Sequence, residues 1–240
     1  MRLAHKDVRM GLEVVVGYAA SLDEDEGESL TRYVDQIAAV QRALAEAELP
    51  GWQEPVKLNQ DFDGFEMLGY SGLHYLRRIA AHLAAGRGLP RPGEEDAPDD
   101  PMLAKVHEDG PRHAVIVDGP LEIIGDADDA VGSFDHLLHH NDAEGFYVPI
   151  DFAPVLIDPR VVGIAVGSSY RLRDECLELA ARLGIPDSLE PDDQVLFDAV
   201  DGKLAAPVGW QEYPVESFVC VGLLHAAQRS IDSATAAVFC

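Results

Sequence analysis

Residues 215–228 read VESFVCVGLLHAAQ, and apolar residues occupy nearly every side of the helix that this stretch would form. A helix that is apolar all round is stable only when other elements cover its whole circumference. We therefore predict a buried C-terminal helix at about residues 215–228. A chain of 240 residues is long enough to bury such a helix in a sizeable core.

Shorter patterns before and after this helix predict the remaining elements. Apolar residues at helical spacing predict further helices at about residues 29–48, 71–85, 129–140 and 169–183. Short apolar and β-branched runs predict strands at about residues 12–18, 114–117, 121–124, 145–152, 161–166 and 234–239. Because the helices are not spaced regularly between the strands, the pattern favours an α+β fold, rich in helix and with a small mixed sheet, over a doubly wound parallel sheet.

The chain is expected to form a single globular domain over residues 1–240. Its best internal boundary is the acidic, Pro- and Gly-rich segment at residues 86–110, which begins GRGLPRPGEEDAPDDP. This composition is typical of a linker and equally of a long surface loop within one domain.

The charge of the chain is strongly negative. It carries 43 Asp and Glu residues against 18 Lys and Arg, a formal net charge of −25, and residues 111–240 hold 22 acidic residues against 7 basic ones. Nucleic-acid backbones are bound by clustered Lys and Arg, so we expect no nucleic-acid partner. The charge favours a basic protein as partner. Genomic base composition or adaptation to high salt would produce the same acidity without any partner. The adjacent Arg77 and Arg78 are expected at the surface, paired with nearby acids.

Residues 135–142 read DHLLHHND and form the densest group of candidate metal ligands. His136 and His140 would share one helical face, with His139 beside them and Asp142 near the helix end. Imidazole together with a carboxylate suits zinc or another divalent transition metal. The run lacks the general-base glutamate of the H-E-x-x-H motif. The alternative interpretation is a set of histidines at a helix C-terminus, where positive charge suits the helix dipole.

A short repeat contains the two tryptophans of the chain. GWQEPV at residues 51–56 recurs as GWQEYPV at residues 209–215, with one inserted residue. The flanking residues do not match, which favours coincidence over an internal duplication. The other interpretation is a pair of exposed aromatic side chains, which makes Trp52 and Trp210 candidate partner-binding residues.

Three cysteines, Cys176, Cys220 and Cys240, are too widely spaced for a zinc ribbon or a redox pair. Reduced thiols are typical of the cytoplasm, and this is the predicted compartment. The N-terminus imitates a signal peptide only loosely, because Asp7 and Glu13 interrupt its basic and apolar regions. No stretch approaches eighteen apolar residues, so no membrane partner is expected.

The sequence contains no complete catalytic or cofactor-binding motif, so no catalytic residue and no cofactor is predicted from it. We interpret the chain as a non-catalytic protein-binding module, of the inhibitor or immunity-like kind, for a basic partner. The alternative is a metal-dependent, hydrolase-like enzyme built on His136, His139, His140 and Asp142. The pattern indicates no oligomeric state.

Overall fold

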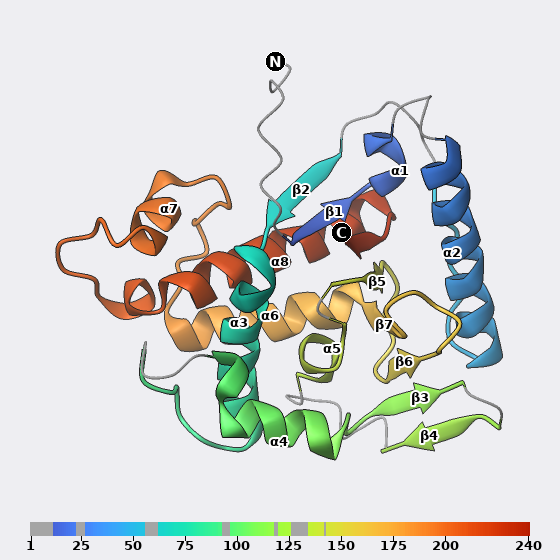
Figure 1. Ribbon diagram of the computed structural model, residues 1–240, viewed down its shortest axis with the longest axis horizontal. Helices are drawn as coiled ribbons and strands as arrows, with labels where there is room; N and C mark the ends of the chain where they lie inside the picture. The colour runs from blue at the N-terminus through green and yellow to red at the C-terminus, as the bar shows by residue number, and fades with distance from the viewer. Residues whose placement is uncertain are drawn as a thin grey trace.

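The computed structural model describes residues 12–22, 27–55, 62–92, 97–117, 120–125, 134–141 and 143–240. Within these ranges the chain forms eight α-helices and one eight-stranded mixed sheet (Figure 1). The predicted α+β class, rich in helix and with a mixed sheet, is confirmed. None of the described helices combines the length and the hydropathy that a span across a bilayer requires.

The sheet draws its strands from both ends of the chain. Its strands are β1 (Glu13–Val16), β2 (Asp63–Glu66), β3 (Ala114–Ile116), β4 (Glu122–Ile124), β5 (Gly145–Val148), β6 (Val155–Ile157), β7 (Ala165–Ser168) and β8 (Ala237–Phe239). Their order is β2-β1-β8-β5-β7-β6-β3-β4. The pairs β5–β7 and β3–β6 are parallel, and the other neighbours are antiparallel. The register places Val238 of β8 opposite both Val15 and Phe146.

Helices cover both faces of this sheet. They are α1 (Tyr18–Ser21), α2 (Gly27–Glu46), α3 (Gly69–Ala84), α4 (Pro101–Asp109), α5 (Asp135–Leu138), α6 (Ser169–Leu183), α7 (Gln194–Val200) and α8 (Pro214–Ser233), with single 3-10 turns at Ala97–Asp99 and Gly209–Glu212. In Figure 1, α2 lies on one side of the sheet, and α3, α6 and α8 lie on the other. The molecule therefore has three layers, with a core on each face of the sheet.

Side chains of the central strands point alternately to the two faces of the sheet, which explains why each face has a core of its own. On β8, Ala237 and Phe239 join the core beneath α3, α6 and α8, whereas Val238 joins the core beneath α2. On β5, Tyr147 joins the core beneath α3, α6 and α8, and Phe146 joins the core beneath α2. Successive side chains of a strand point to opposite faces, so a strand covered on both faces is apolar at nearly every position.

The predicted C-terminal helix is present and buried. It is α8, which extends the predicted range to Pro214–Ser233 and buries residues on all sides, including Phe218, Val219, Cys220 and Leu223. Helices α3, α6 and α7 pack against it, together with strands β1 and β2. This packing supplies the all-round cover that its sequence requires.

The segment at residues 86–110 contains more structure than its composition indicates. Its second half folds into α4, which begins with Pro101 at its first position and is capped by Asp100. The Asp100 side chain accepts the N–H groups of Met102 and Leu103. Leu103 is fully buried in the core shared with α3. Strands on both sides of this segment belong to the same sheet.

Candidate functional site: an acidic lobe around α7

The densest group of acidic residues in the described part of the chain surrounds α7. We call residues 184–202 the acidic lobe. It contains six carboxylates and neither Lys nor Arg; these are Asp187, Glu190, Asp192, Asp193, Asp198 and Asp201. In Figure 1 the lobe projects from the molecule on the side opposite α2.

The lobe begins at the C-terminal end of α6. Gly184 caps α6 in the left-handed conformation, with φ 74°, and its N–H binds carbonyl groups of the last helical turn. A residue without a Cβ adopts this conformation at little cost, so glycine is the usual residue at such a helix end. The chain then leaves the helix axis, and Ile185 and Leu189 anchor it to the core.

Apolar side chains fix α7 on α8. Leu196 and Ala199 are buried in the core on the α8 side of the sheet. The Phe197 ring lies edge-on to Phe218 of α8, with ring centroids 5.3 Å apart. Because one side of the lobe is held in this way, its carboxylates are presented from an ordered surface.

Several of these carboxylates have no Lys or Arg partner among the described residues. Lys203 pairs with Asp201 at 2.7 Å and lies 3.7 Å from Asp198. No Lys or Arg among the described residues forms an ion pair with Asp187, Asp192 or Asp193. The charge of the lobe is therefore only partly compensated, and a cationic surface would gain from approaching it.

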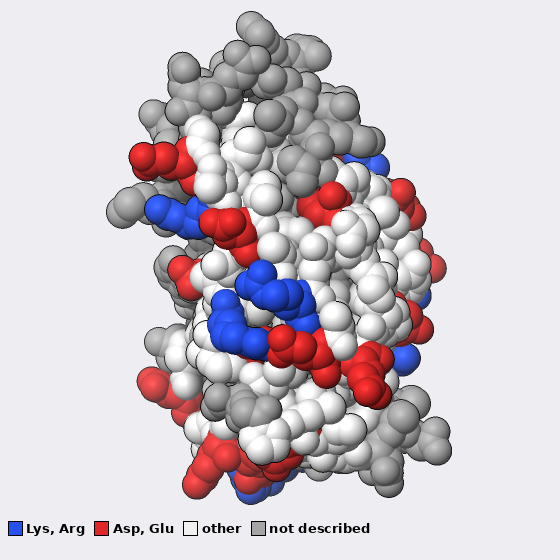
Figure 2. Space-filling view, turned by 90° about the vertical axis from the view of Figure 1, so that its right-hand side faces the viewer, with Lys and Arg blue, Asp and Glu red and all other residues white. Residues whose placement is uncertain are grey.

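Acidic residues on other faces are compensated more completely. Arg160 binds both Glu46 and Asp158, each at 2.6 Å. On α6, Arg173 pairs with Asp174 and Arg182 with Glu178. Figure 2 shows the face that α2 covers, where basic side chains gather next to acidic ones. This mixture distinguishes the α2 face from the acidic lobe.

The structure places His136 and His140 inside the protein, in contact with backbone groups. The Nε2–H of His136 donates to the Ala153 carbonyl at 2.9 Å, and its Nδ1 accepts the Ser168 N–H at 3.0 Å. The His140 nitrogens lie 3.2 Å from the carbonyl oxygens of Asn141 and Phe146. Burial lowers the pKa of His136 to about 3 and the pKa of His140 to about 4. Both rings are therefore neutral near pH 7.

His139 and Asp142 complete the predicted metal site. Burial also lowers the pKa of His139 to about 4, and its Nε2 lies 3.8 Å from an Asp135 carboxylate oxygen. Asp142 lies outside the described residues. Within the ranges that the structure describes, no group of three or more His, Cys, Asp or Glu side chains is arranged to hold a metal ion. The four-residue zinc site stays a prediction.

A buried polar network surrounds α5 instead, and much of it was not predicted. Glu175 of α6 accepts the N–H groups of His136 and Leu137 at the start of α5. Burial raises the pKa of Glu175 to about 8. Arg77 donates to the carbonyls of Leu137 and His140 at the other end. The network satisfies the free backbone groups that every helix end leaves.

The surface position expected for Arg77 and Arg78 is wrong. The two residues are only 1% and 4% exposed. Arg77 is drawn inward because it caps the carbonyl end of α5. Arg78 does pair with an acid, Asp100, at 2.8 Å, but this ion pair is buried between α3 and α4.

The two tryptophans fill the two different cores. Trp52 belongs to the core beneath α2 and donates its indole N–H to the Ala234 carbonyl at 3.0 Å. Trp210 belongs to the core on the α8 side. Each is only 8% exposed. The structure adds no support to a paired aromatic surface, and partner binding by Trp52 and Trp210 stays a prediction.

No curated protein and no solved structure matches this chain. One family model does match, over residues 10–239, and its description is "Putative DNA-mimic protein". This match corrects the predicted function, an inhibitor or immunity-like module, and the predicted partner, a basic protein chosen by charge alone. It gives no support to the hydrolase alternative. Because the match covers nearly the whole sequence, the chain belongs to this DNA-mimic family.

Proposed function

We propose that this protein imitates DNA and that its acidic lobe occupies the DNA-binding surface of a DNA-binding protein. The family description names DNA mimicry. The observation that assigns this activity to the lobe is its six carboxylates within residues 187–201, without one Lys or Arg among them. Such a protein keeps its partner from DNA by competing for the same surface.

The chemistry of DNA recognition explains why carboxylates suit this task. Duplex DNA carries one negative charge for about each 1.7 Å of its axis, and proteins bind it largely through Lys and Arg contacts to phosphate oxygens. A carboxylate offers an Arg guanidinium the same bidentate pairing as a phosphate. A surface with several uncompensated carboxylates therefore presents cationic DNA-binding residues with groups that they already bind.

Packing against α8 contributes to the proposed activity. Leu189, Leu196 and Ala199 hold the lobe against the core. A surface that is ordered before binding loses less conformational entropy when the complex forms. The lobe thereby shares with duplex DNA the property of carrying its charges on a preformed scaffold.

The proposed compartment is the cytoplasm. The three cysteines are free thiols, and Cys220 donates a hydrogen bond to the Cys176 carbonyl without forming a disulfide. Free thiols agree with a reducing compartment.

Competition with DNA tests the proposal. DNA-binding proteins of a cell extract are loaded on DNA-cellulose and eluted with the purified protein. Each eluted protein is then purified, and its affinity for a labelled duplex is measured by fluorescence anisotropy with increasing amounts of this protein. We expect at least one eluted protein to lose DNA in a saturable manner, and more strongly at low than at high salt.

Two charge-matched variants locate the activity. The lobe variant carries Asp187→Asn, Glu190→Gln and Asp192→Asn, and the control variant carries Glu28→Gln, Asp35→Asn and Glu48→Gln at other exposed positions. The lobe variant should compete about tenfold less well or worse, because charge-assisted contacts are lost, and the control should compete as the original protein does. Equal loss in both variants, or no displacement of DNA by the original protein, would refute the proposal.

A further inference from the structure

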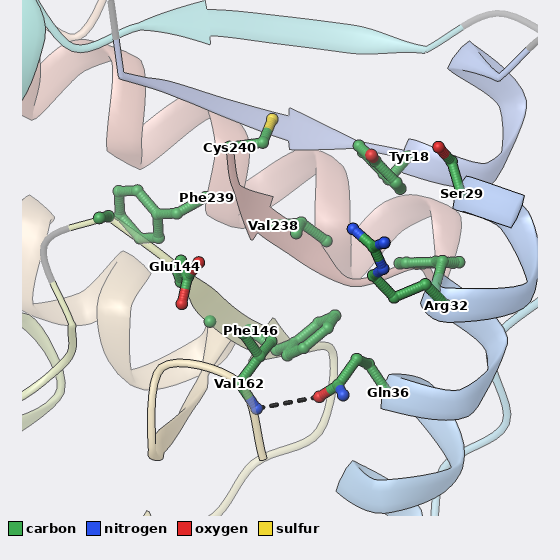
Figure 3. A pocket seen from close by; sticks show the side chains of 13 residues that line it. Tyr18, Ser29, Arg32, Gln36, Glu144, Phe146, Val162, Val238, Phe239 and Cys240 are labelled. Atoms are coloured by element: carbon green, nitrogen blue, oxygen red, sulfur yellow. Dashed lines mark hydrogen bonds between the residues drawn. The ribbon is translucent and has the colours of Figure 1, made fainter. Parts of the chain in front are cut away.

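A concave site lies on the opposite side of the sheet from α8, away from the acidic lobe. It is a cavity of about 360 Å³ between α2 and the strands β5 and β8 (Figure 3). Pockets that take small organic ligands begin at about 300 Å³. The cavity is therefore large enough for a molecule of one or two rings.

The floor of this cavity is apolar and rigid. Phe146 of β5 and Val238 of β8 provide it, and Val162 adds one wall. These strands lie at the centre of the sheet, and the Phe146 ring is held by Tyr33 at a centroid distance of 6.3 Å. An apolar or aromatic body would remove this surface from water.

One cationic group enters the cavity from α2. Figure 3 shows the Arg32 side chain reaching from the helix toward β8. Arg32 forms no ion pair with any described residue, although the chain carries 43 acidic residues. The neighbouring Gln36 already has a partner, because its side-chain oxygen accepts the Val162 N–H at 2.9 Å. A guanidinium remains charged at all ordinary pH values and binds carboxylate or sulfonate groups with two parallel hydrogen bonds.

We propose that this cavity binds an amphipathic organic anion, with an aromatic or aliphatic body on Phe146 and Val238 and an acidic group paired with Arg32. The site does not overlap the acidic lobe, so this inference does not depend on DNA mimicry. The ligand class follows from the combination of an apolar floor with Arg32, a cation that forms no ion pair with a described residue. Glu144 also lines the cavity, so the acidic group of the ligand is expected at Arg32 and away from Glu144.

Binding of the fluorescent probe 8-anilinonaphthalene-1-sulfonate tests the site, because this molecule combines an aromatic body with one anionic group. We expect saturable binding of one probe to the folded protein, at a temperature well below its melting transition. Arg32→Gln should weaken this binding about tenfold, the effect of losing a charge-assisted hydrogen bond. Arg42→Gln, a matched change of an exposed arginine on the same helix, should leave it unchanged.

A neutral probe and a filled cavity complete the test. N-phenyl-1-naphthylamine, which lacks the sulfonate, should bind the original protein and Arg32→Gln equally. Val162→Trp, at a half-buried wall position, should abolish binding of both probes while the lobe variant binds them normally. The proposal is overturned if the folded protein binds no probe saturably, if Arg32→Gln and Arg42→Gln behave alike, or if Val162→Trp binds as the original does.

Discussion

At the scale of single residues, the histidines of residues 136–140 and Glu175 make stability depend on pH in opposite directions. Burial lowers the pKa of His136, His139 and His140 to between about 3 and 4. The unfolded chain therefore binds more protons below pH 6.5, and stability is lost as the pH falls from 6.5 toward 4. Burial raises the pKa of Glu175 to about 8, so the folded state retains that proton, and stability falls as the pH rises from 4.5 to 8.

These opposing effects predict a maximum of stability near pH 6.5. Below this pH, the stability lost through the three histidines exceeds the stability gained through Glu175. Above it, Glu175 should cost about 1.5 kcal/mol by pH 8, since each pKa unit corresponds to about 1.4 kcal/mol. Urea unfolding of the original protein and of Glu175→Gln at pH 5, 6.5 and 8 measures the effect. Glu175→Gln should lose the decline between pH 6.5 and 8, and an undiminished decline would show that another group causes it.

At the scale of secondary structure elements, the attachment of α7 determines whether the acidic lobe stays ordered. Leu196 is 1% exposed and packs into the core on the α8 side. We predict that Leu196→Ala lowers the free energy of unfolding by about 2–4 kcal/mol, because it leaves a cavity. Leu177→Ala, at a half-exposed position of α6, serves as control and should cost less than about 1 kcal/mol. Denaturant unfolding measures both, and equal effects of the two changes would contradict the packing described for α7.

The long helices and most of the strands could be predicted from the sequence, and some of the short elements could not. Helices α2, α3, α6 and α8 each extend over fifteen residues or more, so their apolar periodicity is repeated several times. Helix α7 has seven residues and β6 has three, and neither was predicted. The strand expected at residues 161–166 is β7, which forms at Ala165–Ser168. Runs this short contain too few repeats for a period to distinguish all of them from loops, so only some of them were predicted.

The candidate site was predicted only in part, for a different physical reason. The excess of acid is visible in the sequence, but which carboxylates stay uncompensated depends on distant partners. Arg160, for example, reaches Glu46 across 114 positions of the chain. The histidine cluster is visible in the sequence as an unusual run. The His136 ring, however, forms hydrogen bonds with backbone groups of Ala153 and Ser168, and no spacing rule predicts that these residues lie beside it.

At the scale of the whole molecule, we propose that residues 1–240 form one cooperative domain in spite of the acidic segment at residues 86–110. One sheet contains strands from both sides of this segment, and α4 within it packs against α3. Calorimetry should therefore show one transition, with the calorimetric and van't Hoff enthalpies equal. Far- and near-ultraviolet circular dichroism should follow the same curve. Two separate transitions would indicate two domains.

The position of β8 has a consequence for how the protein is made. Among the described strands, β8 alone joins the pair β2–β1 to the five strands β5, β7, β6, β3 and β4. It also comes after all the other described strands in the order of the chain. A ribosome-bound chain thus holds two unconnected pieces of sheet, each with an open edge, until residues 237–239 emerge from the exit tunnel. The complete sheet forms only after these residues have emerged, and until then its exposed edges are most vulnerable to wrong pairing.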